Sequence, residues 1–236
     1  MRILAVDTST MAGGVALLDS THVLCDLRVV VQTSHTPRLL ALIHHALSIA
    51  SVSLETIDLL AASRGPGSFT GLRIGIATLM GLGQALQRPV LGVDTLEAIA
   101  MKVPFARYPV CAVLDARKGE VYGACFRVTE HGLLRLTPNL VEPPEAFCAH
   151  ITEPMILLGT GVEVYREVWQ SRLGDRAVWA PPWVSMPCSV EVGVLAVAQV
   201  QQGSAGGAPP LTPTYVRLSD AEINWSSGQG LDHPER

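Results

Sequence analysis

The stretch SRGPGSFTGLRIGIA, residues 63–77, restricts the fold more than any other part of the sequence. It is a glycine-rich turn that runs directly into an apolar segment, which we predict to be a helix over residues 70–86. The only charged residue of this helix is Arg73, and apolar or small residues occupy nearly every face. A helix that is apolar all round must be buried on more than one side. The chain must therefore surround this helix with other elements or with a partner.

The loop ahead of this helix has the composition of a phosphate-binding turn. Unpaired N–H groups and the positive dipole end of a helix attract anions. The P-loop pattern also needs a lysine, however, and none follows Gly71. We therefore expect a rigid turn that starts the helix, with unusual backbone angles at its glycines and a hydroxyl cap, and we keep a weak anion contact as an alternative. The residues of this loop and helix start are Gly65, Pro66, Gly67, Ser68, Thr70 and Gly71.

Strand and helix patterns alternate along the chain. A meander of three short strands precedes helices over residues 37–50, 70–86 and 95–103, with apolar strands between them. A second unit of hairpin, strands and helices opens near residue 108. We predict an α/β protein with two subdomains, residues 1–104 and 105–218, each with a mixed sheet and packed helices. A last long helix over about 189–202 is a candidate to pack back on the first subdomain, and 203–210 and 219–236 are predicted to be flexible.

Composition excludes some classes of function. Charged residues make up only 16% of the 236 residues, against about 25% in typical soluble domains. Such a chain either has a large core or hides part of its surface in a partner, and composition leaves both open. The net charge of −4 offers no footprint for independent RNA binding. Scattered cysteines without a C-x-x-C pair, Asp7 interrupting the first apolar run and the lack of a long apolar stretch predict a cytoplasmic protein that does not enter a membrane.

Two helices carry candidate partner-binding residues. In the helix over residues 70–86, small residues recur at every fourth position: Ala77, Gly81 and Ala85. Such a stripe lets another helix approach closely. The alternative is that the stripe packs on the chain's own sheet. The helix over residues 37–50 carries an apolar stripe at i, i+3, i+4 and i+7 spacing. We expect the two helices to lie side by side at a partner interface. The interface candidates are Leu39, Leu42, Ile43, Ala46, Arg73, Ala77, Gly81 and Ala85.

Three polar residues could belong to a nucleotide site. Asp7 at a strand end and Ser9 after it could position a magnesium-bound phosphate, although a strand-terminal Asp that accepts from the N–H groups of the following turn is the simpler explanation. Asp115 also follows a strand, and a solvated hairpin is its simpler explanation. His35, His44 and His45 lack the i, i+3 or i, i+4 spacing of helical metal ligands. We expect no metal, no cofactor and no catalytic residue.

Four segments carry a family resemblance. ILAVDTST, SRGPGSFTGLRIGIAT, PVLGVDTLEA and VLDARKGEVYGA are similar to motifs of the TsaB/YeaZ family, and TPTYVR near the end resembles the family's closing motif. The likeness is strong over residues 1–127 and only general over 128–210. It implies an actin-like, sugar-kinase-like and Hsp70-like fold.

The same resemblance implies a function. TsaB-like proteins are noncatalytic partners of TsaD, the subunit that transfers a threonylcarbamoyl group to an adenosine of tRNA, and the ATPase TsaE contacts the pair. The resemblance implies binding to a TsaD-like subunit, contact with a TsaE-like ATPase, tRNA binding only through the complex, and a homodimer when the chain is alone. Two alternatives stay open: a free-standing phosphotransferase that uses Asp7 and Asp115 with Mg-ATP, and a metallopeptidase.

Overall fold

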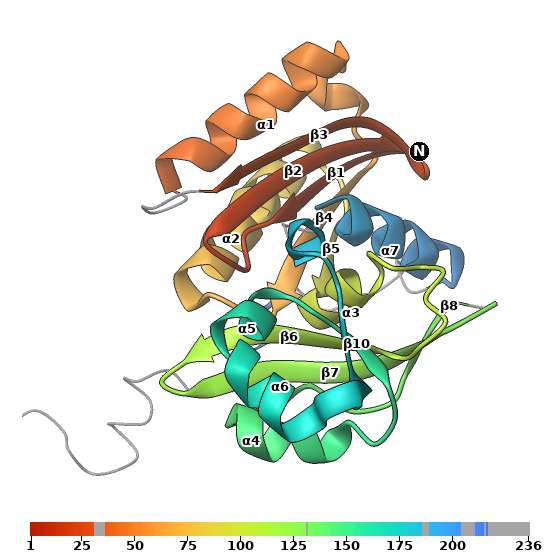
Figure 1. Cartoon of the computed structure of the whole chain (residues 1–236). Coiled ribbons are helices and arrows are strands. Elements are labelled where there is room, and N and C mark those ends of the chain that lie inside the picture. Colours follow the sequence, from red (N-terminus) through yellow and green to blue (C-terminus); the bar gives the residue numbers. More distant parts are fainter. Residues whose placement is uncertain (31–35, 131, 186–188, 204–210, 215, 217–236) are drawn as a thin grey trace, which may run out of the picture.

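The computed structural model describes residues 1–30, 36–130, 132–185, 189–203, 211–214 and 216. The strands of these residues form two sheets, one above the other in Figure 1, with helices above, between and below them. Both sheets combine parallel and antiparallel pairs. This confirms the predicted α/β fold with two mixed sheets. The tail predicted to be flexible over 219–236, and nearly all of the predicted linker, lie outside the described residues.

The first sheet has the strand order β3-β2-β1-β4-β5. Its first three strands are the predicted meander, and β4 and β5 join β1 in parallel after helical crossovers. Its strands are β1 (Arg2–Asp7), β2 (Ala12–Asp19), β3 (His22–Val30), β4 (Leu59–Gly65) and β5 (Val90–Asp94).

Helices cover both faces of this sheet. The helices α1 (Thr36–Ala50) and α2 (Phe69–Leu86) pack on one face, where their apolar residues meet Leu4 and Val6 of β1. The helix α7 (Ser189–Gln201) packs on the other face, against Ile3 and Ala5. Because alternate residues of a strand point to opposite faces, β1 must be apolar at nearly every position to lie between the two layers.

The second sheet has the order β11-β10-β6-β7-β8, with β9 paired to β7. The predictions missed the short strands β9 and β11. The strands are β6 (Val110–Arg117), β7 (Glu120–Thr129), β8 (Gly132–Arg135), β9 (Leu140–Glu142), β10 (Met155–Leu158) and β11 (Ala177–Trp179).

Short helices complete the second unit. Tyr165 separates two of these helices, and the side chain of Trp169, which is buried in the core, donates its indole N–H to the carbonyl of Gly161 at 3.1 Å. The helices are α3 (Thr95–Ala100), α4 (Pro144–Phe147), α5 (Thr160–Val164) and α6 (Arg166–Leu173), with 3-10 turns η1 (Leu54–Thr56), η2 (Cys148–His150), η3 (Gly174–Arg176) and η4 (Pro182–Ser185).

The layer between the sheets is built from both halves of the chain. The helix α3 belongs to the first half and packs against β6 and β7 of the second sheet, whereas α7 closes the sequence order and packs on the first sheet. One apolar core unites the facing sides of both sheets with these two helices. Neither sheet therefore has its inner face covered without the other half of the chain.

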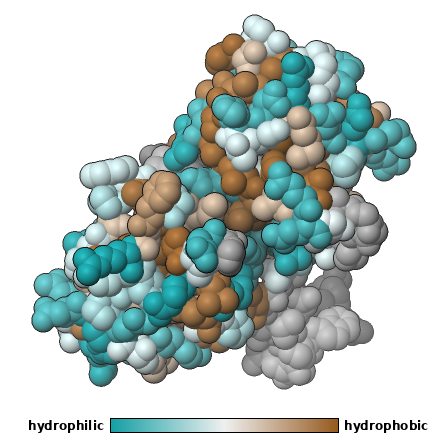
Figure 2. Space-filling view, turned by 90° about the vertical axis from the view of Figure 1, so that its right-hand side faces the viewer, coloured by the Kyte–Doolittle hydropathy of each residue, from teal (hydrophilic) through white to brown (hydrophobic). Residues whose placement is uncertain are grey.

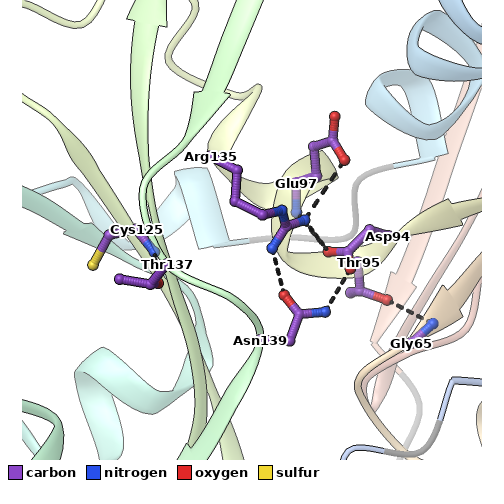
Figure 3. Close-up of polar contacts among 8 residues, drawn as sticks. All are labelled: Gly65, Asp94, Thr95, Glu97, Cys125, Arg135, Thr137 and Asn139. Atoms are coloured by element: carbon purple, nitrogen blue, oxygen red, sulfur yellow. Dashed lines mark hydrogen bonds and ion pairs between the residues drawn. The ribbon is translucent and has the colours of Figure 1, made fainter. Parts of the chain in front are cut away.

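A polar network at the start of α3 joins the two halves (Figure 3). Arg135 of β8 lies 3.4 Å from a carboxylate oxygen of Asp94 and donates to the side-chain oxygen of Asn139 at 2.7 Å. The Asn139 amide donates to the other oxygen of Asp94 at 2.5 Å. Asp94 also caps α3 by accepting from the N–H of Glu97. Two carboxylates and one arginine thus meet where the subdomains touch.

Of these two carboxylates, Glu97 is the one whose charged form is disfavoured. Burial, followed by the negative charge of Asp94, raises the pKa of Glu97 above its usual range, although Arg135 at 3.7 Å favours the charged form. A carboxyl group whose pKa is higher in the folded state binds more protons there than in the unfolded chain. The folded state therefore loses stability as pH rises from the ordinary pKa of glutamate through the raised value.

We expect Glu97→Gln to be more stable, relative to the wild type, at pH 7 than at pH 4, because the amide cannot ionise. Urea unfolding curves of both proteins at pH 4, 5, 6 and 7 measure this difference. Glu167→Gln on the exposed side of α6 is the matched control. A difference between wild type and Glu97→Gln that stays constant across these pH values would contradict the assignment.

Candidate functional site

The loop between β4 and α2 forms several hydrogen bonds within the protein itself. The Ser68 side chain is the N-cap of α2 and accepts from the N–H of Gly71 at 3.2 Å, whereas Thr70 lies exposed in the first turn. The Ser68 N–H donates to the Ser9 carbonyl at 2.7 Å, and the Gly65 N–H donates to the Thr95 hydroxyl at 3.2 Å. Donors that would hold a phosphate in a P-loop thus serve internal hydrogen bonds.

Glycine is required in this loop for backbone angle and for space. Gly65 has a φ of 118° and Gly67 a φ of 156°, and a cis peptide bond joins Gly65 to Pro66. A Cβ at Gly65 would lie 2.5 Å from the carbonyl oxygen of Thr214, whose N–H donates to the carbonyl of Arg64. A Cβ at Gly67 would lie 2.5 Å from the carbonyl oxygen of Ser9. The loop is therefore clamped between the end of β1 and the segment 211–214.

The first two turns of α2 press against the end of β1. A Cβ at Gly71 would collide with the Thr8 carbonyl oxygen, and a Cβ at Gly75 would collide with the Thr8 hydroxyl. That hydroxyl is buried and donates to the carbonyl of Gly71 at 2.7 Å. Thr8 was not singled out from the sequence, because nothing local to residue 8 shows which helix it meets.

Asp7 is buried, with 1% of its surface exposed, and is held by its neighbours. One carboxylate oxygen accepts from the Ser63 hydroxyl at 2.8 Å and from the Ser9 N–H at 2.9 Å. The Ser9 hydroxyl is buried without a hydrogen-bond partner among the residues described. The structure brings Asp7, Ser9 and the 65–71 loop together, with Ser63 as a member that the sequence did not indicate.

Asp115 lies near the end of β6 in the second sheet, two residues before its last residue Arg117, whereas Asp7 is the last residue of β1. One of its oxygens accepts from the Arg117 N–H at 2.9 Å and from the Tyr165 hydroxyl at 3.2 Å. Its own N–H donates to the hydroxyl of Thr160 at 3.3 Å. The guanidinium of Arg117 lies 3.4 Å from the second carboxylate oxygen. Asp115 thus orders the β6–β7 hairpin and ties it to α5 and α6.

The apolar stripe of α1 has an internal role. Leu39, Ile43 and Ala46 are buried against the sheet together with residues of α2, and Leu42 is partly buried. We expected Leu39, Ile43 and Ala46 to form a partner surface, and this expectation is wrong. They belong to the core, because this face of the sheet is apolar and must be shielded from water. The outward side of α1 presents Leu40, 58% exposed, and Ile49, 68% exposed.

The small-residue stripe of α2 faces outward. Arg73, Ala77, Gly81 and Ala85 are all exposed, and a Cβ at Gly81 would meet nothing within 4 Å. Packing of this stripe on the chain's own sheet, the alternative from the sequence, is thereby excluded. The guanidinium of Arg73 lies 3.7 Å above the ring of Phe69, which is itself partly exposed.

A groove of about 600 Å³ runs beside this face. Its walls come from α1, from the turn around η1 and from α2. Apolar side chains from both helices line it, Leu40 and Leu47 on one side and Leu82 on the other. Hydrophobic residues also reach the surface in both lobes on the side shown in Figure 2. Exposed hydrophobic residues alone therefore do not single out α1 and α2 as a candidate partner surface. The small-residue stripe of α2 together with the apolar groove does so.

The described residues contain neither a metal-binding cluster nor a membrane-spanning helix. No group of three or more His, Cys, Asp or Glu side chains in this part of the chain is arranged to hold a metal ion. His44 and His45 are exposed on α1, and His35 lies outside the described residues. None of the described helices has the length and apolar character of a membrane span.

Comparison with known proteins identifies the family. A family model of TsaD, tRNA N6-adenosine threonylcarbamoyltransferase, matches residues 29–225. The tRNA threonylcarbamoyladenosine biosynthesis protein TsaB of Escherichia coli is 30% identical over 226 residues, which cover 92% of this chain and 95% of the relative. The chain belongs to the TsaB/YeaZ family. The resemblance noted in the glycine-rich loop and the other motifs is thereby confirmed.

Solved structures agree with TsaB/YeaZ membership. YeaZ from Pseudomonas aeruginosa is 32% identical and has a TM-score of 0.76, covering 91% of this chain and 99% of that one. TsaB of Bacillus subtilis is 25% identical over 97% of this chain and 100% of its own length. Component A of (R)-2-hydroxyglutaryl-CoA dehydratase from Acidaminococcus fermentans, 11% identical with a TM-score of 0.50 over 85% of this chain and 99% of that one, shares the fold alone.

Substitutions at two glycines of α2 distinguish the effect of close packing on stability from the effect of helix propensity. We expect Gly75→Ala to lower stability by about 1–3 kcal/mol, because the new methyl group would displace the buried and hydrogen-bonded Thr8 hydroxyl. Gly81→Ala is the matched control and should raise stability by about 0.5–1 kcal/mol, since alanine favours the helix and meets no neighbour. Thermal unfolding of both variants tests the pair. Equal effects of the two substitutions would contradict the packing described for Thr8.

Proposed function

We propose that this protein is a noncatalytic subunit in the formation of threonylcarbamoyladenosine in tRNA. In this proposal it binds a larger TsaD-like catalytic subunit through α1 and α2. The observation that carries the proposal is the exposed small-residue stripe Ala77, Gly81 and Ala85, with the exposed Arg73 one turn before it, on a helix whose opposite side is buried in the core. The family gives the pathway, and the exposed stripe gives the surface.

The polar residues support a structural role in place of a catalytic one. In a phosphotransferase, Asp7 and the turn before α2 would have to face a nucleotide. Here a carboxylate oxygen of Asp7 accepts from Ser63 and Ser9, and the N-terminal turn of α2 is capped by Ser68. Thr8 fills the space beside Gly71 and Gly75. These contacts bind the loop to β1, so that the loop fixes the direction of α2.

The exposed side of α2 suits a second helix. Small side chains at every fourth position allow two helix backbones to approach closely, which increases their van der Waals contact. At one end of the stripe Arg73 stacks on Phe69, and residues of these two types are enriched at interface centres. At its side lies the apolar groove lined by Leu40 and Leu82. A partner helix laid along the stripe could place apolar side chains in that groove.

The family resemblance is the basis on which we propose the remaining partners. We propose that a TsaE-like ATPase contacts the pair and that tRNA is bound by the complex, because a chain of net charge −4 attracts little RNA by itself. Without its partner, the chain would pair with a second copy through the same face. We place the protein in the cytoplasm, where the four cysteines described remain free thiols.

The isolated protein should not modify tRNA. Incubation of the purified chain with threonylcarbamoyl-adenylate and unmodified tRNA should yield no threonylcarbamoyladenosine, measured by mass spectrometry of digested nucleosides. Addition of the TsaD-like and TsaE-like proteins from the same organism should produce it. Product formed by the chain alone, at the rate of the complete mixture, would refute the proposed noncatalytic role.

A bulky cation in the stripe should separate binding from folding. We expect Gly81→Arg to fold normally, because nothing lies within 4 Å of the position and arginine is the better helix former. The side chain would prevent close helix approach and leave a charge at the interface, lowering affinity for the TsaD-like partner at least about 100-fold. Melting temperature and sedimentation of the variant, alone and with partner, measure both properties.

The control for this experiment is Gln170→Arg, which adds a cation at an exposed position of α6 in the other subdomain. It should bind the partner as the wild type does. If folded Gly81→Arg also assembled with wild-type affinity, the stripe could not be the binding surface. Failure of Gly81→Arg to fold would contradict the open surroundings of Gly81.

A further inference from the structure

Three of the buried cysteines lie together in the core below the second sheet. Cys111 of β6, Cys125 of β7 and Cys148 of η2 belong to one apolar cluster. We propose that Cys111 and Cys125 form an oxidisable pair, at which a small-molecule disulfide converts two free thiols into a disulfide bond between neighbouring strands. This modification site is separate from the partner surface on α1 and α2 and does not depend on the proposed function.

The strand register places the two cysteines directly opposite each other. Cys111 and Cys125 are paired residues of the antiparallel β6–β7 ladder. Because directly opposite side chains project from the same face of an antiparallel pair, the two thiols share one side of the sheet. Both residues are fully buried there, each 0% exposed.

Backbone hydrogen bonds show which kind of pair this is. The Cys125 N–H donates to the Thr137 hydroxyl at 2.9 Å, and the Cys125 carbonyl accepts from the Leu136 N–H at 2.8 Å. Both groups therefore point away from β6, and Cys111 and Cys125 form a non-hydrogen-bonded pair. In such pairs the Cα atoms lie about 4.5 Å apart, closer than in hydrogen-bonded pairs. Disulfides span Cα distances of about 4.4–6.8 Å, so the strands need not move far to form one.

The two thiols are also unequal, as the partners of a thiol–disulfide exchange usually are. Hydrogen bonding between the two side chains raises the pKa of Cys111 well above its usual range and lowers the pKa of Cys125. Burial opposes ionisation at both sites. Cys125 is thus the better thiolate and the first nucleophile, since the thiolate is the form that attacks.

The oxidation balances with one molecule of oxidant. The Cys125 thiolate attacks a sulfur of the small-molecule disulfide, forms a mixed disulfide and releases one small thiolate. Cys111 then loses its proton and attacks the Cys125 sulfur, which expels the second small thiolate. Two protein thiols are oxidised, the reagent is reduced to two thiols, and the protons pass to the departing sulfurs. Because both cysteines are buried, the reagent reaches them only when the core around them opens locally.

The position of the pair gives the cross-link a structural consequence. In the sequence, Thr137, which accepts from the N–H of Cys125, lies between Arg135 and Asn139, the two residues that contact Asp94; Figure 3 shows Thr137 and Cys125 to one side of that network. A disulfide at Cys125 would tie this segment to β6 and so restrict the strand beside the inter-subdomain network. Thr95, next to Asp94, in turn binds the N–H of Gly65.

The test uses the full-length folded protein and oxidised glutathione. After incubation and alkylation of free thiols, the intact mass should be that of a protein with one intramolecular disulfide. Peptide mapping should join the peptide of Cys111 to that of Cys125, and dithiothreitol should reverse the change. Circular dichroism before and after oxidation verifies that the protein stays folded.

Three variants make the outcome decisive. Cys148→Ala should form the same disulfide, whereas Cys111→Ala and Cys125→Ala, each lacking one member, should not. The last two variants serve as independent checks, so that failure of one to fold leaves the other informative. The proposal is overturned if the folded wild type keeps Cys111 and Cys125 free while the urea-unfolded chain is oxidised. A disulfide that involves Cys148 and disappears in Cys148→Ala would overturn it equally.

Discussion

The apolar layer between the two sheets holds the molecule together. Its two helices are exchanged in sequence order, since α3 covers the second sheet and α7 returns to cover the first. Apolar burial is the main favourable contribution to folding and grows with the area removed from water, so each sheet needs the helix that the other half of the chain supplies. Arg135, Asp94 and Asn139 then fix the relative position of the halves with directional polar contacts.

The residues that follow β1 determine how α2 is placed and therefore which of its residues reach the surface. Thr8 and Ser9 follow β1 and receive the loop and the first turns of α2 at such short range that only glycine fits at residues 67, 71 and 75. The opposite side of the same helix carries the exposed stripe. Close packing inside and open access outside are therefore two properties of one element, and a change at Gly75 would alter the direction of the surface that Gly81 presents.

The residues that could have belonged to a nucleotide site form hydrogen bonds within the protein. Asp7 is the last residue of β1 and Asp115 lies two residues before the end of β6, and each accepts hydrogen bonds from an N–H two residues later and from a neighbouring hydroxyl group. A carboxylate engaged in this way holds a loop in position. On the lower face of the second sheet, three cysteine thiols likewise serve as small apolar side chains that fill the core.

The sequence by itself determined the α/β class, the meander, the principal helices and the family, because these depend on periodicity, on turn residues and on long local motifs. It also indicated that GPGSFTGLR is a helix-starting turn and no P-loop, since the absence of a lysine is visible in the sequence. Only the tertiary structure decided that Leu39, Ile43 and Ala46 are core residues whereas Ala77, Gly81 and Ala85 are exposed. Both stripes have helical spacing, and spacing shows that residues share a face without showing what that face meets. The partners of Thr8, the break at Tyr165 and the pairing of Cys111 with Cys125 likewise depend on contacts between distant segments, which no local pattern encodes.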